Sequence, residues 1–384
     1  MAAPPAPPIS LRKPLFDESC QLLAARFVRK QTRQLSGQLD GIRKGEDIEF
    51  IHRARVASRR LRAALGVFRD GFDAGDVKRW RKRMRRLTTR LGDARDKDVQ
   101  IEFVCDVLGR LEQREHYPGI ARLLVTLEHR RESLQSKAVK AVDRLEAGGV
   151  LEEMQTASKK LLSALEKRGV GVESEFVLAL AEEHVLSKLE EFLDYRSSLE
   201  DPQDQERHHA MRITAKRLRY TMEICKPAYD GQLDEILVAA KQVQSLLGEI
   251  HDCDVWVRQL EIHLEKERER ILEAYGHEGP LARLQVGIDY LRQERAKQRE
   301  EVFRDLVRYW QELDRQGLWD SLAGIVRARA GHSARPELPA NVSDRKVGHK
   351  LAVHWHKLKQ GESGDDSQGT EASSTEQSAE AGKA

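Results

Sequence analysis

Residues 52–62 read HRARVASRRLR and contain neither Gly nor Pro. Most of these residues favour helix, so the segment is predicted to be one α-helix. At about 100° per residue, its imidazole and three of its guanidiniums fall within a sector of roughly 80°. These four residues are His52, Arg55, Arg59 and Arg62. Ala and Leu occupy the opposite side, so the helix has one apolar face and one strongly cationic face.

The same pattern recurs later in the chain, where residues 209–219 read HAMRITAKRLR. A single basic helix face is usually a solvated surface, because Lys and Arg are mostly exposed. Recurrence of the pattern with the His in register predicts that both helices form a binding face. The matching pairs are His52 with His209, Arg55 with Arg212, Arg59 with Lys216, Arg60 with Arg217, and Arg62 with Arg219.

Two further segments repeat at nearly the same separation. LGDARDKDV at 91–99 matches LGEIHDCDV at 247–255, and IARL at 120–123 matches LARL at 281–284. The separations lie between 156 and 161 residues, which indicates one internal repeat with small insertions. Each copy contains about four long segments of helical period, enough for one four-helix bundle. Because strand signals are nearly absent, the predicted fold is all-α.

The predicted domain boundaries follow the repeat and the changes in composition. The Ala/Pro-rich start lacks the apolar core of a signal peptide and is predicted to be disordered. The Ser/Glu/Gly-rich end is predicted to be disordered as well. The predicted parts are a disordered lead at 1–10, a first helical repeat at 11–168, a second at 169–316, a basic C-terminal extension at 317–360, and a disordered tail at 361–384.

Cysteine usage and hydropathy exclude several protein classes. The four cysteines lie far apart without a CxxC pair, which argues against a disulfide scaffold or a zinc ribbon and fits a reducing cytosol. No run approaches about 18 apolar residues, so no membrane span is predicted. We therefore expect a cytoplasmic protein without a membrane partner. The sequence does not predict its oligomeric state.

Positive charge is concentrated in one part of the chain. Between residues 51 and 95, fifteen Lys and Arg residues stand against four Asp residues, although the whole chain carries a net charge of only +3. This segregation predicts a polyanionic partner. A second basic stripe is predicted in the helix at 76–92, and it has no basic equivalent in the second copy. Only the neighbouring Arg85 has a cationic match there, Lys241. The stripe consists of Arg79, Arg83, Arg86 and Arg90.

The histidine at the head of each repeated helix has two interpretations. His52 and His209 could donate hydrogen bonds to a bound anion, and below roughly pH 6.5 they would add positive charge. They could equally cap a helix or form a hydrogen bond between helices. Isolated basic residues outside the repeated pattern are predicted to be solvated surface. These are Arg53, Arg69, Arg81 and Lys82.

No metal, cofactor or catalytic centre is predicted. The dipeptide His251-Asp252 resembles that of metal phosphohydrolases, but its equivalent in the first copy is Arg95-Asp96, and Arg cannot ligate a metal. No Walker A sequence and no Ser nucleophile elbow occurs. The repeated Asp residues follow a Gly and precede an apolar helix, so they are predicted to be N-cap and first-turn residues. These are Asp96, Asp98, Asp252 and Asp254.

The doubled His helix, followed in each copy by the Leu-Gly-x-x-(Arg/His)-Asp-x-Asp-Val segment, resembles the conserved histidine α-helical domain family, CHAD. The resemblance covers roughly residues 11–315. It implies two pseudo-symmetric four-helix bundles around a basic central cleft. It also implies non-enzymatic binding of inorganic polyphosphate and, as in some bacteria, association with polyphosphate granules.

Guanidiniums suit such a ligand, because their fork binds phosphate oxygens two at a time. The residues predicted to line the site, from the repeat and the second stripe, are His52, Arg55, Arg59, Arg60, Arg62, Arg79, Arg83, Arg86, Arg90, Arg95, His209, Arg212, Lys216, Arg217, Arg219 and Lys241.

Two other functions stay open at the level of sequence. A nucleic acid, RNA above all, could offer its phosphates to the same helices, although aromatic residues for base stacking are not interleaved with the basic ones. A metal-dependent phosphohydrolase would need a ligand cluster that obeys the repeat, and none is found. The predicted partner is therefore inorganic polyphosphate, with nucleic acid as a competitor.

Overall fold

The computed structural model describes residues 16–331, all of which belong to one compact unit. No strand occurs in this range, so the predicted all-α fold is confirmed. The lead predicted at 1–10, the tail predicted at 361–384 and the extension from residue 332 onward lie outside the described residues.

Two successive sets of helices make up this unit. The first set is α1 (Glu18–Ser36), α2 (Leu39–Lys44), α3 (Glu49–Val67), α4 (Ala74–Arg110), η1 (Arg114–His116), α5 (Tyr117–Ala147) and α6 (Val150–Lys167). The second set is α7 (Glu175–Leu193), η2 (Arg196–Glu200), α8 (Gln205–Cys225), η3 (Lys226–Ala228), α9 (Asp234–Tyr275), α10 (Leu281–Arg315) and α11 (Leu318–Arg329). Helices α3, α4 and α5 have 19, 37 and 31 residues, and α8, α9 and α10 have 21, 42 and 35. This common order agrees with the predicted repeat.

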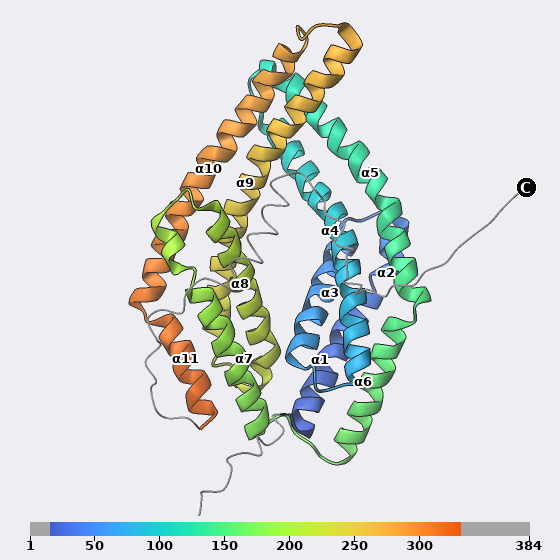
Figure 1. The fold of residues 1–384 in the computed structure, drawn as a ribbon, viewed down its shortest axis with the longest axis vertical. Coiled ribbons are helices and arrows are strands. Elements are labelled where there is room, and N and C mark those ends of the chain that lie inside the picture. The colour runs from blue at the N-terminus through green and yellow to red at the C-terminus, as the bar shows by residue number, and fades with distance from the viewer. Residues whose placement is uncertain (1–15, 332–384) are drawn as a thin grey trace, which may run out of the picture. The chain divides into compact units, whose positions relative to one another are not determined.

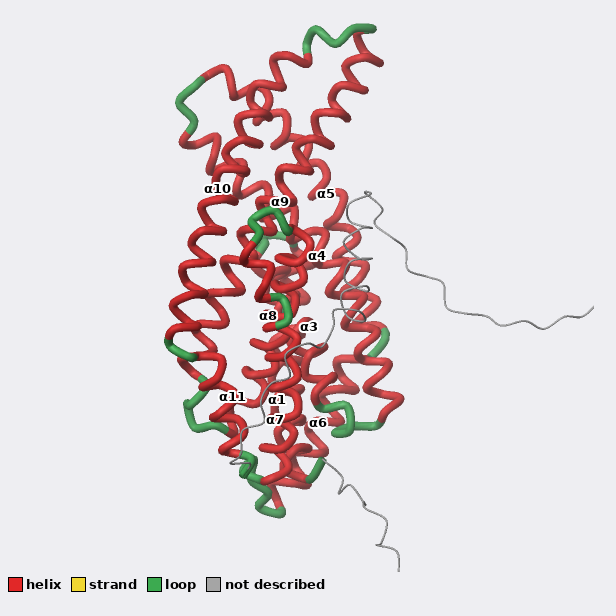
Figure 2. The backbone as a smooth tube through the Cα atoms, turned by 60° about the vertical axis from the view of Figure 1, so that its left-hand side comes forward, coloured by secondary structure: helices red, strands yellow, loops and turns green. Residues whose placement is uncertain are grey.

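The two sets form two groups that meet along their inner helices. In Figure 1, α1 to α6 lie on the right and α7 to α11 on the left, and α5 and α10 converge toward the top. The groups meet where α3 contacts α8 and where α5 contacts α10. Figure 2, turned by 60°, shows the same long helices joined by short loops. The two helices with the repeated basic pattern therefore lie next to each other in space.

Burial of the apolar face of α3 sets the direction of its cationic face. Ala54, Ala57, Leu61 and Leu65 are buried in the core of the first group, as their spacing predicts. Burying one Leu side chain stabilises the fold by about 1.5–3 kcal/mol, so rotation of the helix about its axis would be costly. The row of basic residues on the other side is consequently held away from this core.

Helices α4 and α9 are longer than predicted, because each runs unbroken through a glycine where the sequence was expected to end one helix and start another. Gly92 lies within α4 and Gly248 within α9. A glycine inside a helix costs about 1 kcal/mol relative to Ala, which packing on both sides of it can outweigh. The N-cap and first-turn prediction is therefore wrong for all four residues concerned. These residues, Asp96, Asp98, Asp252 and Asp254, lie in helix interiors.

Two of these aspartates form buried ion pairs that join neighbouring long helices. Asp98 of α4 accepts a hydrogen bond from Arg131 Nε of α5, and both side chains are largely buried. Asp254 of α9 accepts from Arg299 Nε of α10 over 2.5 Å, and both side chains are less than 10% exposed. A buried charge without its partner is strongly unfavourable, so each pair ties its two helices in one register.

Two glycines allow α5 and η1 to lie directly against α10. A Cβ placed on Gly119 would lie 2.1 Å from the carbonyl oxygen of Leu284, and one on Gly287 would lie 2.1 Å from that of His116. No side chain fits at either position without moving backbone. This close approach adjoins an apolar cluster containing residues from both groups, including Ile120 of α5 and Leu291 of α10. The contact of α5 with α10 thus joins the two groups at a second place, apart from the contact of α3 with α8.

Candidate functional site

Basic residues from both groups come together where α3 contacts α8. Helix α3 supplies Arg55, Arg59 and Arg62, and α8 supplies Arg212 and Lys216. All five residues are half-buried. They are called the cationic cluster below.

The positive charges of the cluster act on one another across the contact between the helices. Burial, together with the charges of Arg212, Arg59 and Arg55, lowers the pKa of Lys216 from 10.5 to about 7. Burial also lowers the pKa of Arg59 and of Arg212. Loss of surrounding water and mutual repulsion both make the charged cluster unfavourable unless an anion is bound to it.

Carboxylates within the described part of the chain leave much of this charge unpaired. Arg59, Arg62, Arg212 and Lys216 form no ion pair with any residue described. The Nε atoms of Arg55, Arg59 and Arg212 are buried and have no hydrogen-bond partner among the described residues. Buried donors normally have partners, so these nitrogens favour a ligand that presents several acceptor oxygens at once.

Two carboxylates lie at the α4 and α9 side of the cluster. Asp96 Oδ1 of α4 accepts from Arg55 Nη1 over 3.4 Å. Loss of surrounding water raises the pKa of Asp252 on α9 to about 6, although the charge of Arg212 acts in the opposite direction. These residues neutralise the cluster only in part, and they occupy matching positions in the two sequence copies.

Three predicted site residues form ion pairs at the edge of the cluster. Arg60 Nε of α3 donates to Glu223 Oε2 of α8 over 3.2 Å, and Arg219 donates to the other oxygen of Glu223. Arg217 lies 3.6 Å from Glu191. These three arginines are therefore less available to a ligand than the members of the cluster.

The two repeated histidines have different surroundings. Burial and the nearby charge of Arg95 lower the pKa of His52, and Arg95 itself lies 3.8 Å from Glu49. His209 Nδ1 lies 3.0 Å from His251 Nδ1, so one ring must donate and the other accept. Burial and the charge of Arg212 lower the pKa of His251 to about 2. His209 thus takes part in a hydrogen bond between helices, which was one of its two predicted roles, whereas His52 lies beside an arginine.

The second basic stripe does not lie at the cluster, and this part of the site prediction is corrected. Arg79 donates to Glu153 of α6 over 2.7 Å. The guanidinium carbon of Arg83 lies 4.0 Å from where a Cβ on Gly148 would be, at the turn between α5 and α6. By helical spacing, Arg86 and Arg90 share this face. Helix α4 has a polar side on each flank of its apolar stripe. The side that carries the second basic stripe lies toward α5 and α6.

The opposite polar side of α4 contributes two arginines that sequence reasoning missed. Arg81 Nη2 lies 3.9 Å from where a Cβ on Gly66 of α3 would be. After burial, the charges of Arg85 and Arg81 are the main influences that lower the pKa of Arg62. Arg81 was predicted to be plain solvated surface and is exposed, as predicted, but its charge also acts on Arg62 of the cluster.

A signal for these arginines exists in the spacing along α4. The hydroxyl groups of Thr88 in α4 and Ser58 in α3 are hydrogen-bonded at 2.9 Å and are buried. Arg81 and Arg85 lie seven and three residues before Thr88, hence on the same side of α4. A small buried hydroxyl near a series of arginines could have marked this side as the one that packs on α3.

Lys241 lies on α9 and is exposed. It stands three residues before Gln244, whose side chain accepts from Arg219 Nε over 2.8 Å. By helical spacing, Lys241 lies about 60° around α9 from Gln244.

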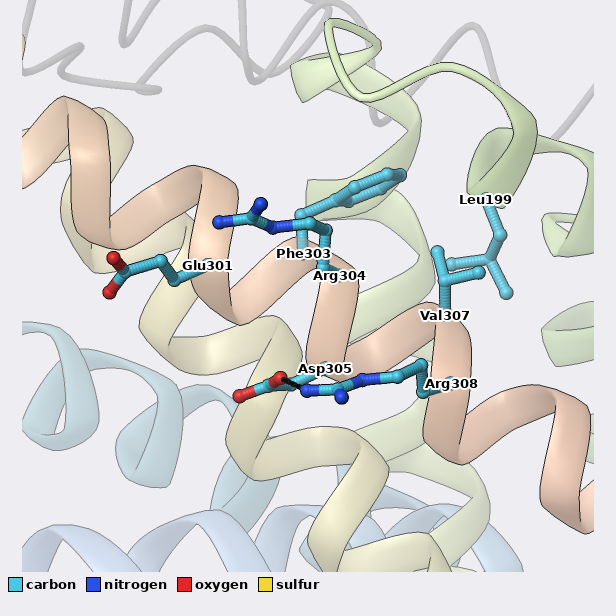
Figure 3. Close-up of a pocket in the computed structure, with 7 residues that line it drawn as sticks. All are labelled: Leu199, Glu301, Phe303, Arg304, Asp305, Val307 and Arg308. Carbon is cyan, nitrogen blue, oxygen red and sulfur yellow. Dashed lines mark hydrogen bonds and ion pairs between the residues drawn. The ribbon is translucent and has the colours of Figure 1, made fainter.

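Other features of the described residues lie away from the cluster. A surface pocket of about 580 Å³ is formed by Leu199 and residues of α10, and its aliphatic part is bordered by an Arg308–Asp305 ion pair (Figure 3). It contains no predicted site residue. No group of three or more His, Cys, Asp or Glu residues in 16–331 is arranged to hold a metal ion. None of the described helices is long and apolar enough to cross a membrane.

Comparisons with known proteins bear on the fold and the family. The family model of the CHAD domain matches residues 26–261. A crystal structure of the CHAD domain from the plant Ricinus communis matches with a TM-score of 0.50 and 20% identity, covering 83% of this chain and 94% of that chain. At this identity the likeness concerns the fold. No curated protein matches this chain.

Proposed function

Because the chain belongs to the CHAD domain family, we propose that it binds inorganic polyphosphate at the cationic cluster and carries out no reaction on it. One observation supports the proposal above all others. Five half-buried cations from two helices far apart in sequence are brought together, and four of them form no ion pair within the described residues. A folded protein tolerates such an arrangement most readily when an anion joins it.

Polyphosphate suits the cluster for chemical reasons. It carries about one charge per phosphoryl unit on a flexible chain, so several units can reach guanidiniums on both helices without one fixed register. The arginines can bind phosphate oxygens in pairs through Nε and Nη. Release of counterions would make the binding tight and steeply dependent on salt.

We further propose that the protein is cytoplasmic and associates with polyphosphate granules, since a protein that binds the polymer would collect where the polymer is concentrated. Fluorescent tagging in cells rich and poor in polyphosphate checks this. Foci that form only in the polyphosphate-rich cells are expected. A diffuse signal in both would contradict granule association without affecting the binding proposal.

Isothermal titration with long-chain polyphosphate tests the binding. We expect saturable binding at moderate salt by the unaltered protein. The variant R59Q/R62Q/K216Q removes three members of the cluster and should bind at least about tenfold more weakly, with the slope of log K against log salt reduced by about 2. A matched control, R196Q/K266Q/R283Q, removes three exposed cations from elsewhere and should bind normally.

Four outcomes oppose the proposal. Absence of saturable binding removes it, and equal binding by the cluster variant and the control moves the site elsewhere. RNA that displaces polyphosphate at equal phosphate concentration favours a nucleic-acid-binding protein. Release of phosphate in the presence of Mg²⁺ or Mn²⁺ contradicts the absence of catalysis.

A further inference from the structure

The arginine stripe that does not reach the cluster forms part of a second basic surface on the opposite side of α4. Arg83, Arg86 and Arg90 lie on one face of α4. On α5, Arg130, Lys137 and Arg144 stand seven residues apart and share a face as well. Helices α4 and α5 pack against each other along their length. We call these six residues the outer surface.

Several contacts show that the two faces lie side by side. Arg83 approaches Gly148, whose backbone N–H bonds the carbonyl oxygen of Arg144 over 3.3 Å. Burial raises the pKa of Asp93 on α4, whereas the nearby charges of Arg90, Lys137 and Arg55 lower it. Cations of both helices therefore line one continuous strip. From residue 83 to residue 97 this strip extends for about 21 Å along α4, at 1.5 Å per residue.

The strip contains little negative charge. None of its six cations forms an ion pair with any described residue, and five of the six are exposed. Asp93 is the one acidic residue that the helical spacing places among them. Farther along α4, burial and then the charge of Arg130 lower the pKa of Lys97 to about 8, so a further cation lies at this end. Elsewhere the described surface alternates acidic and basic residues in many ion pairs.

The outer surface and the cationic cluster are two separate sites. At 100° per residue, Arg81 and Arg85, which lie beside the cluster, are about 100–180° around α4 from Arg83, Arg86 and Arg90. The apolar core of the first group, with Trp80 and Met84 buried in it, adjoins α4 between the two sides. The core therefore separates the cluster from the outer surface along this side of α4.

We propose that the outer surface binds a second chain of inorganic polyphosphate, so that one molecule of this protein bridges two polyphosphate chains. This inference rests on the proposed function of the cluster. A linear polyanion matches the strip because it can present phosphoryl groups to successive cations along its whole length. No aromatic side chain occurs in residues 130–148 of α5, so the surface offers no platform for stacking bases.

A capture experiment tests the bridge. Long-chain polyphosphate is immobilised on beads, the full-length protein is loaded, unbound protein is washed away, and a fluorescent polyphosphate of the same length is added. The unaltered protein should retain the fluorescent chain. The variant R83Q/R86Q/R90Q should load onto the beads but retain about tenfold less fluorescence, because three phosphate contacts are lost. The control R196Q/K266Q/R283Q loses the same charge and should retain as much as the unaltered protein.

Each outcome has a distinct meaning. If the unaltered protein does not load, the proposed function itself fails. If it loads but captures nothing, one chain occupies both sites or the outer surface binds no polyphosphate, and the inference is overturned. If R83Q/R86Q/R90Q captures normally, bridging arises elsewhere, for example through two clusters of a dimer, and the inference is again overturned. Preferential capture of labelled duplex DNA or RNA over polyphosphate would reassign the surface to nucleic acid.

Discussion

Arg60 Nε of α3 donates a hydrogen bond to Glu223 Oε2 of α8 over 3.2 Å, although the two residues are 163 positions apart in the chain. Both side chains are about one-fifth to one-third exposed. The same carboxylate accepts from Arg219, so a single glutamate joins cations from both groups at the edge of the cluster. This contact therefore ties α3 to α8.

Replacement of Glu223 by Gln should therefore destabilise the protein and make its stability depend more strongly on a bound anion. We expect a loss of about 1–2 kcal/mol in the free energy of unfolding, because two half-buried arginines lose their charged partner. Urea unfolding with and without polyphosphate measures this, and the loss should shrink when the polymer is present. The exposed Glu300, which forms no ion pair within the described residues, provides the control Glu300→Gln. Equal effects of the two substitutions would contradict the role of Glu223.

Lys216 should make polyphosphate binding dependent on pH between about 7 and 9. Its pKa in the free protein is about 7, against 10.5 in the unfolded chain, so above pH 7 it is largely neutral before binding. A bound polyanion favours the charged form, hence binding takes up a proton and weakens as the pH rises. Isothermal titration at pH 8 in buffers of different ionisation enthalpy measures the proton uptake.

The variant Lys216→Arg separates this residue from other titrating groups. Arginine stays charged, so the variant should take up fewer protons at pH 8 than the unaltered protein, and its binding should change less between pH 7 and pH 9. Asp252, with a pKa of about 6, and His52 and His251, whose pKa values are lowered by burial, titrate below this window, whereas Lys97, with a pKa of about 8, titrates within it. Proton uptake that is undiminished in Lys216→Arg would assign it to another group, such as Lys97.

Lys216 also affects stability in the absence of ligand. Its pKa is lower in the folded protein, so between about 7 and 10.5 the unfolded chain binds more protons than the folded one. The free energy of unfolding should therefore rise with pH across this window, and below about 7 the contribution of Lys216 is unfavourable and constant. Urea unfolding at pH 7 and pH 9 should show a smaller rise for Lys216→Met than for the unaltered protein.

The ion pair of Asp254 with Arg299 should be one of the most sensitive polar contacts. Asp254→Ala leaves a buried guanidinium without its partner, and we expect a loss of about 3–5 kcal/mol in the free energy of unfolding. Asp305→Ala, which breaks an exposed pair with Arg308, should cost less than about 1 kcal/mol. Urea unfolding of both variants makes the comparison, and similar losses would contradict the importance assigned to the buried pair.

The glycines at the crossing of α5 and α10 should tolerate no side chain. Gly119→Ala and Gly287→Ala each place a Cβ 2.1 Å from a backbone oxygen, so we expect each to destabilise the protein by about 1–3 kcal/mol. Gly248→Ala, within α9 and with nothing inside 4 Å of the new Cβ, should be neutral or stabilise by about 0.5–1 kcal/mol. Thermal unfolding ranks the three variants. A stabilising effect at Gly119 would mean that the helices cross at a greater distance.

The sequence by itself determined the helical class, the amphipathic character of α3 and the correspondence of α3 with α8. These properties are local, because the angle between His52, Arg55, Arg59 and Arg62 depends only on helical periodicity. The residues opposite them form the predicted apolar face, and of these Leu61 and Leu65 are fully buried. The repeat also directed attention to Asp96 and Asp252, although their predicted role as helix caps was wrong.

The tertiary structure alone decided which basic residues meet. Helix α4 has a polar side on each flank of its apolar stripe, and helical periodicity does not distinguish the two sides. Packing on α3 directs Arg81 and Arg85 toward the cluster, whereas packing toward α5 and α6 directs Arg83 and Arg90 to the outer surface. The neighbours of a side chain depend on contacts between helices that are distant in sequence. Such contacts cannot be read from the periodicity of either helix.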